Sequence, residues 1–110
     1  MAFKIVRNYS CWGLYESLII PLYGGGVIYE VGKPTIPKKG YGPLAAFKTM
    51  KNVEEFKSLN GWKEEPVFRC RVKKDKKSTS VSTPTYHKPA YRLPSGTVLC
   101  KSITLTKQIG

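Results

Sequence analysis

The chain has 110 residues, with 19 Lys and Arg against 7 Asp and Glu, a formal net charge of +12 and 41% hydrophobic residues. This length fits one domain with a modest core, and the apolar content is too high for a disordered basic tail. A basic protein attracts polyanions and is not itself a mimic of nucleic acid, which would be acidic. Residues 1–7 lack the apolar stretch of a signal peptide, and the apolar run 18–20 is too short to cross a bilayer. We therefore expect a cytoplasmic protein with no membrane partner.

The first half of the chain predicts short strands separated by turns. Residues 3–7 alternate between two faces, which predicts a first strand. The apolar segment 15–22 is interrupted by a proline, and the three glycines at 24–26 supply a tight turn. The β-branched and aromatic run 27–31 predicts a strand, and residues 34–42, with two prolines and two glycines, predict a loop.

One short helix is predicted in the middle of the chain. Asn52 is a suitable N-cap and Glu55 would occupy the third helical position, a variant of the capping box. Gly61 supplies the C-terminal stop. A helix of about nine residues must be held by packing rather than by propensity. The apolar residues that recur at helical spacing are Val53, Phe56 and Leu59.

The second half predicts two longer strands around a polar segment. Residues 66–72 alternate apolar and basic side chains, which places Phe68, Cys70 and Val72 toward the core and Arg69 and Arg71 toward solvent. Residues 97–105 are the longest strand candidate. The basic, Ser/Thr/Pro-rich segment at about 73–96 is predicted to be a loop. Together these elements predict one α+β domain, a small antiparallel sheet of about four to six short strands with one short helix packed on it.

Positive charge is concentrated between residues 69 and 92, which contain eight basic residues and one acid. Basic groups with aromatics nearby suit contacts to a phosphate backbone and stacking on single-stranded bases, although a charged hairpin tip can also serve only solubility. A second basic loop would strengthen the nucleic-acid interpretation if it lies on the same face. The candidate binding residues are Arg69, Arg71, Lys73, Lys74, Lys76, Lys77, Lys88 and Arg92, the aromatics Tyr86 and Tyr91, and Lys33, Lys38 and Lys39 of the second loop, and Phe68 is a further aromatic that flanks the basic run.

The three cysteines, Cys11, Cys70 and Cys100, are an odd set with wide spacing, typical of reduced thiols in a cytoplasmic protein. Cys70 and Cys100 lie in strand-like apolar runs, where a free cysteine is usually a small buried hydrophobe. With the single histidine His87 and no paired CxxC motif, we expect no metal site and no cofactor.

No catalytic constellation is evident. The carboxylates of residues 54–55 and 64–65 are adjacent in sequence and point apart, so neither pair is a natural acid–base dyad. No local motif brings His87 to a cysteine, and the glycines at 24–26 lack the following lysine of a P-loop. The run 78–80, Ser-Thr-Ser, resembles a strand of one class of ADP-ribosyltransferases, but no carboxylate side chain follows Asp75 to complete that site. We expect a protein without enzymatic activity.

A longer pattern resembles a group of small uncharacterised phage and prophage proteins. It runs from Tyr29-x-Val31-Gly32-Lys33 through Pro37, Gly42-Pro43-Leu44, Phe47, Phe56 and Val67-Phe68-Arg69-Cys70 to Pro94-x-Gly96-Thr97-Val98-Leu99-Cys100. These are turn and core positions, so the resemblance implies a shared fold and carries no catalytic residue over. It also implies a viral or mobile-element origin and action in a host cytoplasm, where small accessory proteins often bind and block host machinery, including defence complexes.

Three functions follow from these observations. The leading hypothesis is a non-enzymatic basic protein that binds nucleic acid or a nucleoprotein and thereby inhibits a host defence system. The first alternative is a protein-binding inhibitor that docks on an acidic host surface. A distant alternative is a degenerate ADP-ribosyltransferase-like protein that handles nucleotides. The first two both require exposed Lys and Arg, and the sequence leaves them open, together with the oligomeric state.

Overall fold

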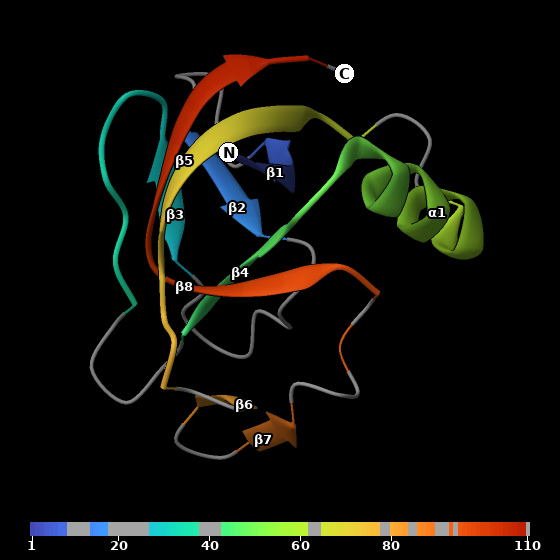
Figure 1. Cartoon of the computed structure of the whole chain (residues 1–110). Helices are drawn as coiled ribbons and strands as arrows, with labels where there is room; N and C mark the ends of the chain where they lie inside the picture. Colours follow the sequence, from blue (N-terminus) through green and yellow to red (C-terminus); the bar gives the residue numbers. More distant parts are fainter. Residues whose placement is uncertain are drawn as a thin grey trace.

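The structure is a computed structural model, and it describes residues 1–8, 14–17, 27–37, 43–61, 65–77, 80–83, 86–89, 93 and 95–109. Within these ranges a six-stranded antiparallel sheet carries one helix, and two further strands form a separate hairpin (Figure 1). This confirms the predicted small α+β fold. The elements are β1 (Ala2–Asn8), β2 (Leu14–Ser17), β3 (Ile28–Glu30), β4 (Leu44–Phe47), α1 (Met50–Asn60), β5 (Val67–Lys74), β6 (Ser80–Thr83), β7 (Tyr86–Pro89) and β8 (Thr97–Gln108).

The six-stranded sheet closes on itself into a small barrel. Its strand order is β3-β2-β1-β4-β8-β5, and β1 also pairs with β5, from Ala2↔Cys70 to Ile5↔Val67. The long strand β8 makes this closure possible, because its first part pairs with β4 and its remainder pairs with β5. Figure 1 shows β5 and β8 curving together along one side of the barrel, with α1 on the opposite side. Closure satisfies strand edges that an open sheet would leave unpaired.

Alternation along the strands produces two apolar clusters. The first fills the barrel interior, and the second lies between the barrel wall and α1. Strand β1 serves both, since Ala2 and Val6 face the interior while Ile5 faces the helix. Each fully buried Val, Leu, Ile or Phe side chain in these clusters contributes about 1.5–3 kcal/mol relative to an exposed one. The interior cluster consists of Ala2, Val6, Tyr29, Leu44, Ala46, Phe68, Cys70, Cys100, Ile103 and Leu105.

The helix begins earlier than the sequence predicts. Its N-cap is Thr49, whose hydroxyl oxygen accepts a hydrogen bond from the backbone N–H of Asn52, so Asn52 is the third helical residue and not the cap. Gly61 ends the helix in the left-handed conformation, as predicted. Val53 is buried against the barrel and Phe56 packs on Phe47, but Leu59 is 86% exposed and does not extend the apolar stripe.

Two segments differ from or add to the elements that the sequence predicts. Residues 44–47, for which the sequence predicts no element, form β4, and because all four side chains are buried the segment shows no alternation. The segment 73–96 is not simply a loop, because Lys73 and Lys74 belong to β5 and β6 pairs with β7 as a hairpin, from Ser80↔Pro89 to Thr83↔Tyr86. The strands expected at 3–7, 27–31, 66–72 and 97–105 are present with shifted ends. Among the described residues, no helix has the length and apolar character needed to span a membrane.

Candidate functional site

The most concentrated charge in the described part of the chain lies on the outer side of β5. Phe68 and Cys70 are buried in the barrel interior, so the alternate residues Arg69, Arg71 and Lys73 point outward, and all three are exposed. The apolar–basic alternation of the sequence is therefore confirmed. Because the inward side chains anchor the strand in the core, the three cations form one row on its outer side.

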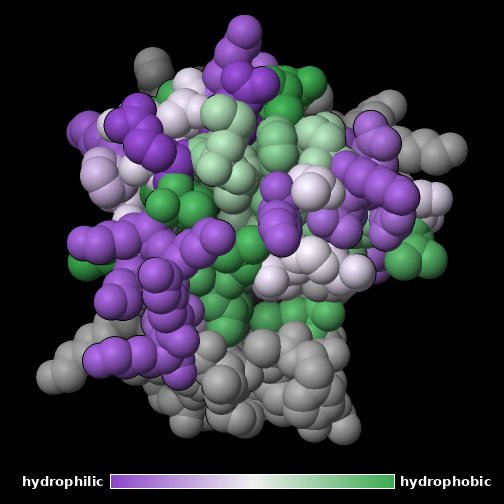
Figure 2. Space-filling model, in the orientation of Figure 1, coloured by the Kyte–Doolittle hydropathy of each residue, from purple (hydrophilic) through white to green (hydrophobic). Residues whose placement is uncertain are grey.

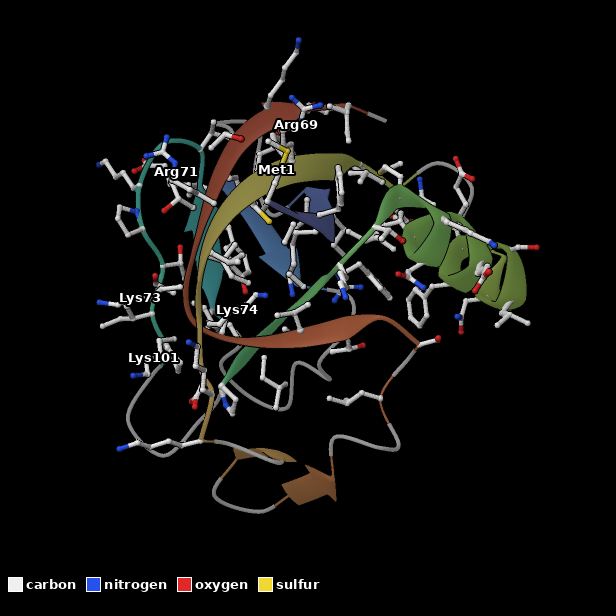
Figure 3. The ribbon with its side chains drawn as sticks, viewed as in Figure 1. Met1, Arg69, Arg71, Lys73, Lys74 and Lys101 are labelled. Carbon is white, nitrogen blue, oxygen red and sulfur yellow. The ribbon has the colours of Figure 1, made fainter. Side chains whose placement is uncertain are left out.

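Strand β8 places further polar groups beside this row. In the register of the two strands, Lys107 lies opposite Arg69, Thr104 opposite Arg71 and Ser102 opposite Lys73. Residues directly opposite in an antiparallel pair share one face. Figure 3 shows Lys101 on the same side of the barrel as Lys73 and Arg71. We call this surface the β5–β8 basic face, which consists of Arg69, Arg71, Lys73, Ser102, Thr104, Lys101 and Lys107.

Two irregularities in the β5–β8 ladder shape the basic face. The register shifts between Arg69 and Cys70 and again between Lys73 and Lys74, and each shift leaves one extra residue on β8. The first extra residue, Thr106, donates its hydroxyl to the carbonyl oxygen of Arg69 at 2.8 Å. The second is Lys101, which is exposed. Bulges bend a strand and redirect its side chains, and here the second bulge adds Lys101 at the end of the cation row next to Lys73.

The charges of this face are not compensated by the described acidic residues. Arg69 stands directly opposite Lys107, although like charges facing each other on a sheet destabilise it. No described carboxylate forms an ion pair with Arg69, Arg71 or Lys73. Figure 2 shows hydrophilic residues gathered along the side where β5 and β8 run together, and a second hydrophilic region over α1. A sheet face that breaks a stability rule without internal compensation is a candidate for function.

Of the three lysines in the second basic segment, the structure describes Lys33, which lies next to β8. The backbone N–H of Gly32 donates to the carbonyl oxygen of Leu105 at 2.8 Å, and Thr35 pairs with Ile103. Lys33 is thus carried alongside β8, on the edge away from β5. Its ammonium group forms a 2.7 Å ion pair with Glu30, which raises the pKa of Lys33 and offsets its charge. Lys33 therefore adds less to the basic potential than its position suggests.

Other predicted site residues lie elsewhere. Lys74 follows Val72 on the inner side of β5 and is exposed at the end of the barrel. Lys76 and Lys77 come after the strand and are exposed. Phe68 is buried in edge contact with Tyr15, with ring centroids 4.8 Å apart, so it cannot stack on bases. Tyr86 and Lys88 belong to β7 but their side chains are not described, and Lys38, Lys39, Tyr91 and Arg92 lie outside the described residues.

A second polar constellation lies inside the barrel, where the sequence predicts none. Lys4 is fully buried, and its ammonium group donates to the carbonyl oxygen of Ala45 and lies 5.4 Å from the centroid of the Tyr29 ring. Burial lowers the pKa of Lys4 to about 8 and raises those of Cys70 to about 12 and Cys100 to about 11. These groups are closed off from solvent, so the arrangement is a structural polar centre within an apolar core.

Sequence reasoning found the row on β5 and missed the part of the site on β8. Lys101, Ser102, Thr104 and Lys107 carry no local motif, and only the strand register brings them beside β5. Among the described residues no group of three His, Cys, Asp or Glu side chains could hold a metal ion. Comparison of the chain with protein-family models, curated proteins and solved structures found no match.

Proposed function

We propose that this protein is a non-enzymatic binder of nucleic acid, free or within a nucleoprotein, and that the β5–β8 basic face is its interface. The observation that carries the proposal is the row of Arg69, Arg71 and Lys73, which no described carboxylate pairs with, together with Lys101 and Lys107 beside it. Phosphate contacts from Lys and Arg supply most of the sequence-independent affinity for nucleic acid. The face consists of cations and hydroxyls, which suits binding rather than proton transfer.

The cellular consequence that we propose is occupation of nucleic acid or of a nucleoprotein, so that a host defence complex cannot act. It rests on the resemblance to phage and prophage proteins and on the strong positive charge. Electrostatic steering by such a charge speeds association with polyanions and weakens with ionic strength. The alternative function, docking on an acidic host protein, would use the same cations. Oligonucleotide binding and capture from lysate with and without nuclease distinguish it from nucleic-acid binding.

A charge-matched pair of triple variants tests the interface. The first replaces Arg69, Arg71 and Lys73 by Gln, and the second replaces Lys48, Lys51 and Lys57, which lie on or beside α1, by Gln. Both lower the net charge by three. We expect the first to lose most affinity for a labelled DNA or RNA oligonucleotide and the second to lose little, measured by fluorescence anisotropy at low salt. Equal losses would show that net charge alone causes binding and that the face is not an interface.

Capture of partners from host lysate, with and without nuclease, tests the class of partner. We expect wild-type protein to retain nucleic acid and its associated proteins, and the Arg69/Arg71/Lys73 variant to retain neither. Loss of the captured proteins after nuclease supports the proposal. Retention of a captured acidic protein after nuclease, together with no oligonucleotide binding by the purified protein, would overturn it.

A further inference from the structure

We infer that the β5–β8 basic face holds a phosphodiester backbone through two cation–hydroxyl pairs, Arg71 with Thr104 and Lys73 with Ser102, and does not read the bases. The inference rests on the proposed function and deepens it by assigning Ser102 and Thr104 as binding residues. It follows from three observations. The register of β5 and β8 places each hydroxyl opposite a cation, the two hydroxyls make no hydrogen bond to a described residue, and neighbouring segments pair with both strands.

The register places each hydroxyl next to a cation on the same face. Residues directly opposite on antiparallel strands have Cβ atoms about 4.5–5.5 Å apart, close enough for both side chains to reach one phosphate group. Arg and Lys together with Ser and Thr are common donors to phosphate oxygens. The two pairs are one strand repeat apart, about 6.6 Å along β5, which is of the order of the separation of successive phosphates on one nucleic-acid strand.

Both hydroxyls are available to a ligand within the described structure. Ser102 and Thr104 are half-buried, and neither hydroxyl makes a hydrogen bond to another described residue. The contrast with Thr106 on the same strand is informative, because its hydroxyl donates to the carbonyl oxygen of Arg69 and so supports the bulge. Thr106 therefore has a structural role, whereas Ser102 and Thr104 carry donors that the fold does not use.

The surroundings of the two strands argue against base reading. A two-stranded ribbon can enter the major groove only if it projects from the protein. Here β5 is paired with β1 over Val67–Cys70, and β8 is bonded to the segment at Gly32 and Thr35 along its other edge, so neither strand projects from the barrel over its whole length. The described residues of the face include no aromatic ring, so stacking on bases has no platform there. The contacts that remain are those to the backbone.

The test combines a hydroxyl-deleting double variant with oligonucleotides of different base composition. Ser102→Ala with Thr104→Val removes both donors and keeps the charge, and Ser58→Ala, at an exposed helical serine, is the matched control. A neutral hydrogen bond contributes on the order of 0.5–1.5 kcal/mol, so affinity should fall about two- to tenfold for each hydroxyl. Thr104→Ser, which retains the donor, should bind like wild type. Single strands of equal length but different base should bind with similar affinity.

The outcomes separate this inference from the proposed function. If the Arg69/Arg71/Lys73 variant loses binding while the folded hydroxyl variant binds like wild type, the inference is overturned and the proposed function stands. A strong preference for one base at equal length would also overturn it. If the hydroxyl variant fails to fold by circular dichroism, Thr104→Val is compared with Thr104→Ser, and equal affinity of these two overturns the pairing at Arg71. Unchanged binding by the Arg69/Arg71/Lys73 variant overturns the proposed function itself.

Discussion

The ammonium group of Lys4 on β1 donates a hydrogen bond to the backbone carbonyl oxygen of Ala45 on β4. The main chains of these two strands pair at a single position, Phe3↔Phe47, so the pairing of β1 with β4 does not extend to Ala45. The Lys4 side chain supplies a donor to that residue's carbonyl from inside the barrel, and the Tyr29 ring lies beside it. A buried carbonyl left without a donor would destabilise the fold, so Lys4 connects the strands where their ladder stops.

The protonation of Lys4 makes stability depend on pH. Its pKa is about 8 in the folded protein against 10.5 for an ordinary lysine, because burial disfavours the charged amine. The folded state therefore binds fewer protons than the unfolded state between about pH 8 and 10.5, and its stability rises with pH in that window. A shift of this size corresponds to about 3 kcal/mol. We expect the free energy of unfolding of wild type, relative to Lys4→Met, to rise by that order over this range.

The comparison with Lys4→Met removes the opposing contributions. Burial raises the pKa of Tyr29, and it raises those of Cys70 and Cys100 to about 12 and about 11. These groups ionise more readily once the chain unfolds, so both proteins lose stability above about pH 9. Denaturant unfolding of the two proteins across the range measures the difference. A difference that does not change with pH would show that the folded protein does not perturb the amine.

The two described cysteines should be unreactive in the native protein. Cys70 and Cys100 are buried in the barrel, and their raised pKa values leave little thiolate, which is the reactive form. We expect alkylation at neutral pH to modify both only as fast as the protein opens, and rapidly in denaturant. Mass spectrometry of peptides distinguishes these sites from Cys11. Fast native labelling of either one would contradict its burial.

A cysteine substitution provides an independent check of the interior. Replacing Cys70 by Ser places a hydroxyl in an apolar core and should lower stability by about 1–3 kcal/mol. Binding should persist while the variant is folded, since the thiol faces away from the basic face. Thermal melting and anisotropy measure the two properties. Loss of binding in a stable variant would indicate a functional thiol.

Gly96 should be intolerant of a side chain for two separate reasons. Its φ of +79° disfavours other residues, and a Cβ there would lie 2.2 Å from the side chain of Asn52, which Thr49 holds by a 2.6 Å hydrogen bond. Gly61→Ala is the matched control, because Gly61 has a φ of +70° with nothing near its Cβ. We expect the control to cost about 1 kcal/mol and Gly96→Ala to cost more. Adding Asn52→Ala should recover the excess, so an additive double-mutant cycle would contradict this contact.

The salt dependence of binding counts the phosphate contacts. Each neutralised phosphate of duplex DNA contributes about −0.9 to the slope of log affinity against log salt concentration. If all five cations of the β5–β8 basic face take part, the slope should be about −4.5, and the Arg69/Arg71/Lys73 variant should flatten it by about 2.7. Replacing Lys74, Lys76 and Lys77 by Gln should change it less, because these residues lie outside the face. If both triple variants reduce the magnitude of the salt slope equally, the interface would also include the residues that follow β5.

Local sequence patterns were sufficient to predict the elements that have one apolar and one polar face. The apolar–basic alternation of residues 68–72 predicts both the strand and the outward row of cations, and Gly61 marks the end of the helix. The start of the helix is misplaced because Thr49 and Asn52 are both good caps, and the geometry selects Thr49. Strand β4 has no polar face to reveal it, since closure of the barrel and the helix bury both of its sides.

The remaining features depend on contacts between distant segments. No local pattern fixes the register of β5 against β8, so the positions of Lys101, Ser102, Thr104 and Lys107 beside the cation row follow only from pairing across the sheet. The burial of Lys4 also depends on pairing between distant strands. The sequence placed Lys4 on one face with Val6, and closure of β1 onto β5 turned that face into the interior of a barrel. Charge and alternation are properties of the chain, whereas register and closure are set by the packing of the whole sheet.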